Sequence, residues 1–292
     1  MTASTVSLVL GTLGRVEMFD STLDGRAAFV NPTTGDTNIK GKKILDVKVH
    51  DKLVKYPTNL TEAELLDHIS SDGKANIQAK YWPETAQLVK QYTGATHVIP
   101  FNSRVRNQTL GYHPDEVFFM RTGVSQPAST VHVDNDHVTA MQHAVRELGE
   151  EEIKNLIAKH KRWAAINMWR PIGIPVKQWP LLIVDHNRVR PMSYANDIAP
   201  IYSHNNPEYV LNYKQYKNWL KYQPERAGDF TFWYANNMTP EAILFKDYDC
   251  RTDHFRGIPH GGFQDYSSTT DAPACRSVEV RRFVFFDNDK FH

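Results

Sequence analysis

The chain has 292 residues, of which 41% are hydrophobic and 23% are charged, an ordinary composition for a soluble globular protein. Its 34 basic residues balance 33 acidic ones, and a net charge of +1 excludes the strongly basic surface of a nucleic-acid-binding protein or a polybasic membrane anchor. Two cysteines, Cys250 and Cys275, are too few for a disulfide framework or a four-cysteine zinc site.

The N-terminal segment MTASTVSLVLGTLG does not have the pattern of an export signal. No basic region precedes its apolar run, which is also too short to span a bilayer. We therefore expect a cytoplasmic enzyme or binding protein with no nucleic-acid partner and no membrane span, and a homodimer is compatible with the sequence.

The first half of the chain predicts loops, short strands and helices. Residues 1–45 indicate loops with short edge strands such as residues 26–30. In LTEAELLDHI, Thr61 can cap a helix because Glu64 follows three residues later. A second helix is expected from Pro83 to Gly94, since proline favours the start of a helix and glycine its end.

Further along, two β-rich runs precede a helical segment. Residues 96–101 and 116–120 favour strands, and the run from residue 136 to 163 predicts two helices joined near Gly149. Segments 70–78 and 102–116 are candidate loops for a lid over a site, because such gates often lie on mobile loops.

The second half consists of short β-type segments separated by turn residues. These segments are WAAINMWRPI, WPLLIVD, FTFWYANN, AILFKDYD and SVEVRRFVFF. Their spacing is typical of an antiparallel sandwich or barrel, a group that includes jelly rolls and cupins. We predict one domain over residues 1–292, mainly β with flanking helices, in which residues 126–292 form the core and residues 1–125 add helices, loops and extra strands around it.

The segment STVHVDNDH, residues 129–137, has the spacing of a metal site. In a strand, His132 and Asp134 would point to one side while Val131 and Val133 pack on the other. A distant second histidine would complete the two-histidine, one-carboxylate triad of non-haem Fe(II) oxygenases, which leaves coordination positions open. The alternative is a buried, hydrogen-bonded pair without a metal.

The third ligand must be a histidine far along the chain. The candidates are His186, His204, His254 and His260. We favour His260, because a turn at residues 267–271 would form a hairpin that brings it opposite residue 278 and near Arg281. Two of the other candidates, in YSHNN and RTDHFRG, stand in polar segments and are expected in solvent.

The last predicted strand, SVEVRRFVFF, offers a partner for an organic anion. Ser277, Glu279 and Arg281 share one of its faces. An inward-pointing Arg281 can hold a carboxylate through two parallel hydrogen bonds, as the far end of a metal-bound 2-oxo acid requires. Arg276 should lie further from the metal. The alternative is a surface Arg281 paired with Glu279 or Asp287.

Aromatic residues on the predicted core strands can line a substrate pocket. Trp169, Trp233 and Tyr234 would give an apolar, aromatic environment suited to a terpenoid, to which Asn167 and Asn237 can add polar contacts. The alternative is that the three aromatic side chains only pack in the core.

Over residues 45–292 the sequence resembles the fungal oxygenases related to gibberellin desaturases and to the aspergillic-acid hydroxylase. The resemblance rests on YWPETAQLVKQYTGATHVIPFNSRVR, VHVDND, INMWRPI, WPLLIVDHN, FWYANNMTPEAILFKDYD, PHGGF and SVEVRRFVFF. Within the family, the sequence is most similar to the type that forms endoperoxides on meroterpenoids. It departs from the expected Arg-x-Ser before the final strand, where Cys275 stands in place of the arginine.

The resemblance implies the double-stranded β-helix, a jelly-roll, cupin-like fold, with Fe(II) and 2-oxoglutarate as cofactors. It implies that iron is held by His132, Asp134 and His260, and 2-oxoglutarate by Arg281, with Arg276 and Ser277 as further candidates. The expected reaction removes hydrogen from a small hydrophobic metabolite, using O2, and leads to an endoperoxide, a hydroxylated product or a desaturated product.

Two other functions remain open from the sequence. The triad can bind another divalent ion in a cupin-like isomerase or a binding module without oxygen chemistry. His132 and Asp134 can also be structural, in a non-enzymatic sandwich protein that associates through its aromatic surface.

Overall fold

The fold is known from a computed structural model that describes most of the predicted core. The described residues are 8–9, 22–30, 42–51, 60–67, 71–107, 128, 131–185, 198–202, 216–220, 231–234, 242–251, 256–262, 264–265, 269, 271–273 and 275–288. The strand expected at residues 116–120 lies outside them.

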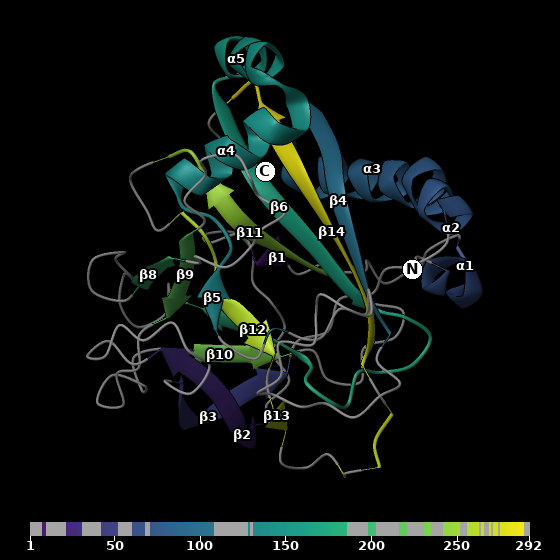
Figure 1. The fold of residues 1–292 in the computed structure, drawn as a ribbon, viewed down its shortest axis with the longest axis vertical. Helices are drawn as coiled ribbons and strands as arrows, with labels where there is room; N and C mark the ends of the chain where they lie inside the picture. Colours follow the sequence, from purple (N-terminus) through teal and green to yellow (C-terminus); the bar gives the residue numbers. More distant parts are fainter. Residues whose placement is uncertain are drawn as a thin grey trace, which may run out of the picture.

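A five-stranded sheet forms the frame that supports the site. Its order is β1 (Leu8–Val9), β11 (Ile243–Asp249), β6 (Arg162–Pro171), β14 (Arg276–Phe286) and β4 (His97–Asn107). Only β1 pairs in parallel among these strands, and the long strands β6, β14 and β4 run antiparallel side by side (Figure 1). Segments distant in sequence are therefore joined along nearly their whole length.

A second sheet contains nine strands among the described residues. Its order is β13 (Gln264–Asp265), β2 (Thr22–Val30), β3 (Lys42–Asp51), β10 (Thr231–Tyr234), β7 (Leu181–Asp185), β12 (His260–Gly262), β5 (His132–Val133), β9 (Tyr216–Leu220) and β8 (Ile198–Tyr202). The structure is thus mainly β with flanking helices, as predicted. Strands from the first 125 residues pair within both sheets, and the division of the domain at residue 125 stays a prediction.

The two faces of the five-stranded sheet have different partners because side chains alternate along each strand. One face, here called the outer face, carries Ile166, Met168 and Val280 and is covered by helical residues such as Leu88 and Val89. The helices on this side are α1 (Glu62–Leu66), α2 (Ser71–Asn76), η2 (Ile77–Tyr81) and α3 (Trp82–Thr93). Residues 71–78 are therefore helical, and the prediction of a lid loop at residues 70–78 was wrong for them.

The opposite, inner face is divided along the strands. At one end, Phe283 and Trp163 pack against α4 (His137–Leu148) and α5 (Glu150–Lys159). At the other end, Trp169 and Phe245 pack against Ile183 of the second sheet. Polar side chains occupy the space between these two apolar clusters, and they form the candidate site.

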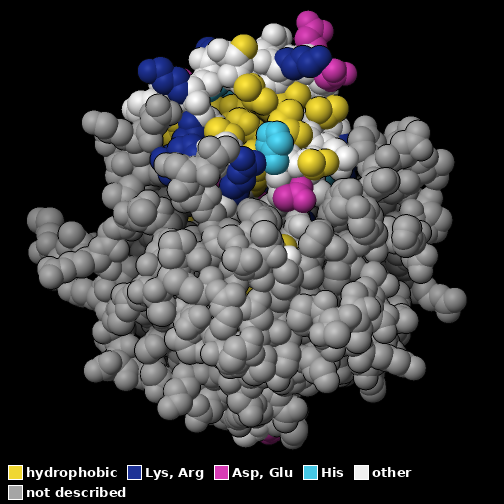
Figure 2. Space-filling model, turned by 90° about the vertical axis from the view of Figure 1, so that its left-hand side faces the viewer, with side chains coloured by type: hydrophobic (Ala, Val, Ile, Leu, Met, Phe, Trp, Pro, Cys, Tyr) yellow, Lys and Arg dark blue, Asp and Glu magenta, His cyan; other side chains and the backbone are white. Residues whose placement is uncertain are grey.

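The surface near α4 and α5 carries apolar side chains. Figure 2 shows hydrophobic side chains of described residues grouped beside lysine and arginine at the upper end of the molecule, where α5 lies in Figure 1. Val138, near the start of α4, is 51% exposed. The apolar side of α4 is therefore not wholly turned to the core.

Local sequence signals account for the helix boundaries. Thr61 and Glu64 form the expected capping box of α1, although this helix ends at Leu66, earlier than predicted. The helix predicted from Pro83 to Gly94 is α3, and Gly94 ends it with a φ of 69°. Gly149, with a φ of 86°, separates α4 from α5 as expected.

The hairpin that led to His260 was wrong. His260 is in the second sheet, paired with His132 and Ile183, whereas residue 278 is in the five-stranded sheet, paired with Val105 and Arg170. Strand pairing is set by contacts between distant segments, which the turn sequence at residues 267–271 does not report.

A β-bulge changes the direction of side chains in β11. The register with β6 shifts between Lys246 and Tyr248, so that Asp247 is an additional residue in this strand. Tyr248 consequently packs in the inner cluster with Trp163, whereas Asp249 points the other way and pairs with Arg162.

Among the described residues, no helix is long and apolar enough to cross a membrane.

We expect Asp249→Ala to lower the free energy of unfolding by about 3–5 kcal/mol, because it leaves the guanidinium of Arg162 buried without its carboxylate. Both side chains are 0% exposed, and Arg162 also lies 5.1 Å from the ring centre of Phe286. Denaturant unfolding measures the change. Lys154→Ala, which removes an exposed pair with Glu150 on α5, is the control and should cause no measurable change. Equal stabilities of the two variants would contradict the importance of the buried pair.

Candidate metal centre

The candidate metal centre is built on two neighbouring strands of the second sheet. His132 of β5 is paired directly with His260 of β12, and Asp134 follows one residue after the end of β5. Val131 and Val133 are buried, as expected if they point away from His132 and Asp134. The alternation predicted for VHVD therefore agrees with the structure.

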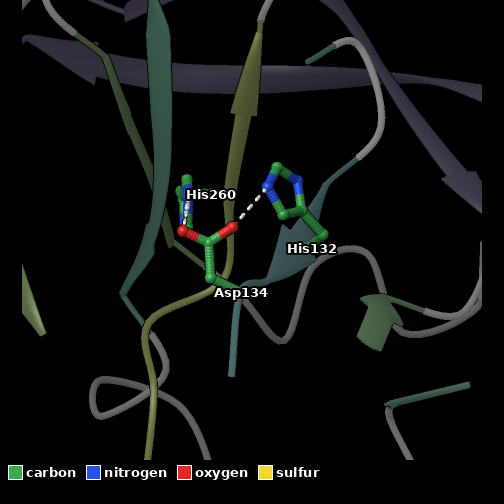
Figure 3. Close-up of side chains that lie close together, drawn as sticks. All are labelled: His132, Asp134 and His260. Atoms are coloured by element: carbon green, nitrogen blue, oxygen red, sulfur yellow. Dashed lines mark ion pairs between the residues drawn. The ribbon is translucent and has the colours of Figure 1, made fainter. Parts of the chain in front are cut away.

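The three side chains converge on one point, as Figure 3 shows. Their ligand atoms all lie within 4.8 Å of one another. Asp134 Oδ1 is 3.2 Å from His132 Nε2, and Asp134 Oδ2 is 3.9 Å from His260 Nε2. The arrangement is compact enough for one ion to contact all three residues.

The orientation of His260 is fixed by its second ring nitrogen. Nδ1 lies 2.9 Å from the carbonyl oxygen of Ile258, which can only accept a hydrogen bond, so Nδ1 carries the proton and Nε2 presents a lone pair. Burial, followed by the nearby His132, lowers the pKa of His260 to about 4. The imidazole is therefore neutral near pH 7, as a metal ligand must be.

Asp134 is held from the five-stranded sheet. Arg281 Nη2 lies 3.1 Å and Asn167 Nδ2 3.2 Å from Asp134 Oδ2. Burial favours the neutral acid, but Arg281 and the two histidines outweigh it and hold the pKa of Asp134 well below its usual range. Both donors act on Oδ2, which also lies toward His260, whereas Oδ1 faces His132 and has no donor from the five-stranded sheet.

A second buried carboxylate organises these donors. Glu279 accepts hydrogen bonds from Arg281 Nε and Arg106 Nη1, each at 3.1 Å, and from Asn167 Nδ2 at 3.4 Å. Burial alone would raise the pKa of Glu279, but Arg281 and Arg106 lower it to about 2. The pairing of Arg281 with Glu279 was an alternative from the sequence, where it was expected at the surface; here Glu279 is buried.

Asp247, the additional residue of the β11 bulge, lies beside this network. It is 0% exposed and accepts a hydrogen bond from Asn135, the residue after Asp134. Burial raises the pKa of Asp247 well above its usual value, and the negative charge of Asp134 acts in the same direction. Gly257 allows this packing, since a Cβ atom there would lie 2.4 Å from the backbone oxygen of Asp247 and 2.5 Å from Val133 Cγ1.

The other predicted site residues have different positions. Ser277 is buried on the inner face, with its hydroxyl 3.7 Å from Cys275 Sγ. Arg276 precedes it in β14, so the alternation of the strand directs its side chain to the outer face. Trp169 is buried in the inner apolar cluster with Phe245. Their predicted roles remain predictions.

Several candidates cannot be placed. The side chains of Trp233 and Tyr234, on β10, lie outside the described part of the structure, as do Asn237 and the alternative ligands His186, His204 and His254. The candidate lid at residues 102–116 is strand up to Asn107 and lies outside the described residues beyond it.

The sequence prediction missed three polar residues around the triad. Arg106, Asn135 and Asp247 have no motif that marks them, and each is brought to the site by the pairing of strands or by a bulge. The run NSRVRN in β4 carried one available signal, because its two arginines are two residues apart and share a face.

Comparisons with known proteins agree with the fold and the site. Residues 37–285 match the family described as the oxidoreductase/YMDC permease-like domain. The oxidoreductase clz16 of Cochliobolus lunatus is 32% identical over 301 aligned positions, which cover 98% of this chain and 100% of the relative. The Fe(II)/2-oxoglutarate-dependent dioxygenase nvfI of Aspergillus novofumigatus is 26% identical, with 76% of this chain and 72% of the relative covered.

The fold also matches a solved structure, that of a variant of the iron- and alpha-ketoglutarate-dependent endoperoxidase NvfI. The TM-score is 0.70 at 22% identity, with 93% of this chain and 98% of the other covered. The match of the family over most of the chain, together with the full-length similarity to clz16, shows that this chain belongs to the oxidoreductase/YMDC permease-like family.

Proposed function

We propose that the protein is an Fe(II)- and 2-oxoglutarate-dependent dioxygenase in which His132, Asp134 and His260 hold the iron. The convergence of two imidazoles and one carboxylate within 4.8 Å carries this proposal. In the same proposal, the two sheets form a double-stranded β-helix and the chain is a single oxygenase domain.

The chemistry of the donors fits iron in an open site. Two histidines and one carboxylate are the ligands of non-haem Fe(II) oxygenases, whereas structural zinc sites are closed by four protein ligands. Within the described residues, no fourth histidine, cysteine, aspartate or glutamate joins the group. Positions on the ion are thus left for small molecules.

Bound together, Fe(II) and 2-oxoglutarate supply the oxidising chemistry with O2, in which 2-oxoglutarate is converted to succinate and carbon dioxide. The protein fixes the geometry. The carbonyl of Ile258 orients His260, and the donors from Arg281 and Asn167 occupy Asp134 Oδ2, so that Oδ1 is available for binding through one oxygen. Arg281 and Asn167 come from β14 and β6 of the five-stranded sheet, and Ile258 lies two residues before β12 of the second sheet.

The substrate that we propose is a small hydrophobic metabolite of the terpenoid class. His260 packs against Phe245 at a ring-centre distance of 4.6 Å, and Phe245 belongs to the apolar cluster with Trp169 and Ile183. An apolar environment therefore begins directly beside the triad. The similarity of the fold to the endoperoxidase NvfI supports an endoperoxide as the product, and hydroxylation or desaturation of another small metabolite is the alternative.

The triad is tested by metal titration. We expect His132→Ala, Asp134→Ala and His260→Ala each to weaken Fe(II) or Mn(II) binding by at least about 100-fold, because each removes one of three protein ligands. Calorimetric titration of the apoprotein measures binding, and thermal unfolding checks the fold. His97→Ala, at an exposed histidine in β4, is the control and should retain full affinity. Stoichiometric binding in all the triad variants would contradict the proposed site.

The cofactor is tested by visible absorption without oxygen. Addition of 2-oxoglutarate to the Fe(II) protein should produce a weak charge-transfer band if the oxo group and the adjacent carboxylate both bind iron. The band should be absent in His260→Ala. A wild-type protein that binds Fe(II) but gives no band would instead favour a cupin-like metalloprotein without oxygenase activity.

One variant distinguishes two roles of Asn167: orientation of the proposed metal ligand Asp134 and contact with the substrate. We expect Asn167→Ala to lower Fe(II) affinity about 10- to 100-fold, because this amide donates to both Asp134 and Glu279 and residues of this kind orient metal ligands. The same calorimetric titration measures it, with Asn76→Ala on α2 as the control. Unchanged metal affinity with a higher KM for substrate would favour the substrate contact predicted from the sequence.

A further inference from the structure

We infer that Arg106 anchors the distal carboxylate of 2-oxoglutarate, while Arg281 is a positioning residue for Asp134. This inference rests on the proposed function. It assigns to Arg106 the binding of the distal carboxylate, for which the sequence suggested Arg281 or Arg276. It is carried by the register of β4 and β14 and by the ion pairs on the inner face.

Arg281 is already bound to two carboxylates beside the metal. Its Nη2 lies 3.1 Å from Asp134 Oδ2 and its Nε 3.1 Å from Glu279 Oε1. A guanidinium in this position neutralises an iron ligand, and it lies beside the metal-binding end of a 2-oxo acid.

Arg276 is directed away from the site. It is paired with Asn107 at the start of β14 and alternates with the inward residue Ser277. Its side chain therefore belongs to the outer face of the sheet, on the side of the helices. A ligand held between the two sheets would not reach it.

Arg106 has the position that the far end of a dicarboxylate requires. Its backbone lies opposite Ser277 on β14, four residues or about 13 Å along the strand from Arg281. Its side chain is buried and reaches back to Glu279, two residues or about 7 Å from Arg281. Glu279 therefore lies between Arg281 and Arg106 along β14, and Arg106 approaches the Glu279 carboxylate from the end of the strand that carries Ser277.

Ser277 completes a carboxylate-binding pair across the two strands. Its hydroxyl is buried next to Cys275, and its backbone lies directly opposite that of Arg106 in the pairing of β14 with β4. A guanidinium and a hydroxyl together suit one carboxylate. Cys275 stands where an arginine was expected two residues before Ser277, and we infer that Arg106 supplies the guanidinium from β4.

The test compares 2-oxoglutarate with 2-oxopentanoate, which has the same five carbons and the same metal-binding end but no distal carboxylate. Both are titrated anaerobically into the Fe(II) protein, and the charge-transfer band gives each dissociation constant. We expect Arg106→Gln to weaken 2-oxoglutarate about 10- to 100-fold and to leave 2-oxopentanoate unchanged. Arg106→Lys, which keeps the charge but not the planar fork, should restore part of the affinity.

Arg281 and Arg276 give the contrasting results. Arg281→Gln should weaken Fe(II) binding itself and affect both oxo acids equally, with partial recovery in Arg281→Lys. Arg276→Gln should leave both dissociation constants unchanged, as should Arg146→Gln at an exposed arginine of α4. The preference for 2-oxoglutarate over 2-oxopentanoate decides the outcome. The inference is overturned if Arg281→Gln or Arg276→Gln loses this preference while Arg106→Gln or Arg106→Lys keeps it.

The outcome separates this inference from the proposed function. A wild-type protein that gives no band with either oxo acid disproves the cofactor assignment and, with it, the inference. A wild-type band that forms with 2-oxoglutarate and is unaffected in both Arg106 variants leaves the function standing and disproves the role of Arg106.

Discussion

The ion pair between Asp134 and Arg281 joins the two sheets at the point where the chemistry is proposed to occur. Asp134 follows β5 of the second sheet, and Arg281 belongs to β14 of the first. A buried carboxylate remains ionised only if positive charges or donors surround it. Glu279 fixes those donors in turn, so the proposed metal ligand Asp134 depends on side chains that reach it from β14 and β6.

The division of the inner face explains why this polar network tolerates burial. Phe283 with α4 and α5 closes one end, and Phe245 with Trp169 closes the other. Glu279 is buried between these apolar clusters, where electrostatic interactions are stronger than at the surface. The same apolar surroundings would make an unpaired Glu279 costly, which accounts for its three donors.

The sequence predicted local features better than pairings between distant segments. Side-chain alternation was sufficient to bring His132 and Asp134 to one side of β5, and the capping box of α1 could be recognised from Thr61 and Glu64. His260 was chosen through a hairpin that does not form, because its true partner is His132. The alternation in NSRVRN puts Arg106 on one face with Arg104, but only the register with β14 brings it near Glu279. That register depends on packing across the whole sheet.

The bulge in β11 adds Asp247 beside the candidate site and leaves the other side chains of the strand in their alternating directions. Lys246, Tyr248 and Asp249 would alternate regularly opposite β6 if Asp247 were absent, since the register shift falls at this residue. Shortening the strand by one residue would thus remove an acid beside the site and keep the pair between Asp249 and Arg162. A single residue in the length of this strand therefore decides whether a buried acid lies beside Asn135, while the core contacts of its neighbours stay in place.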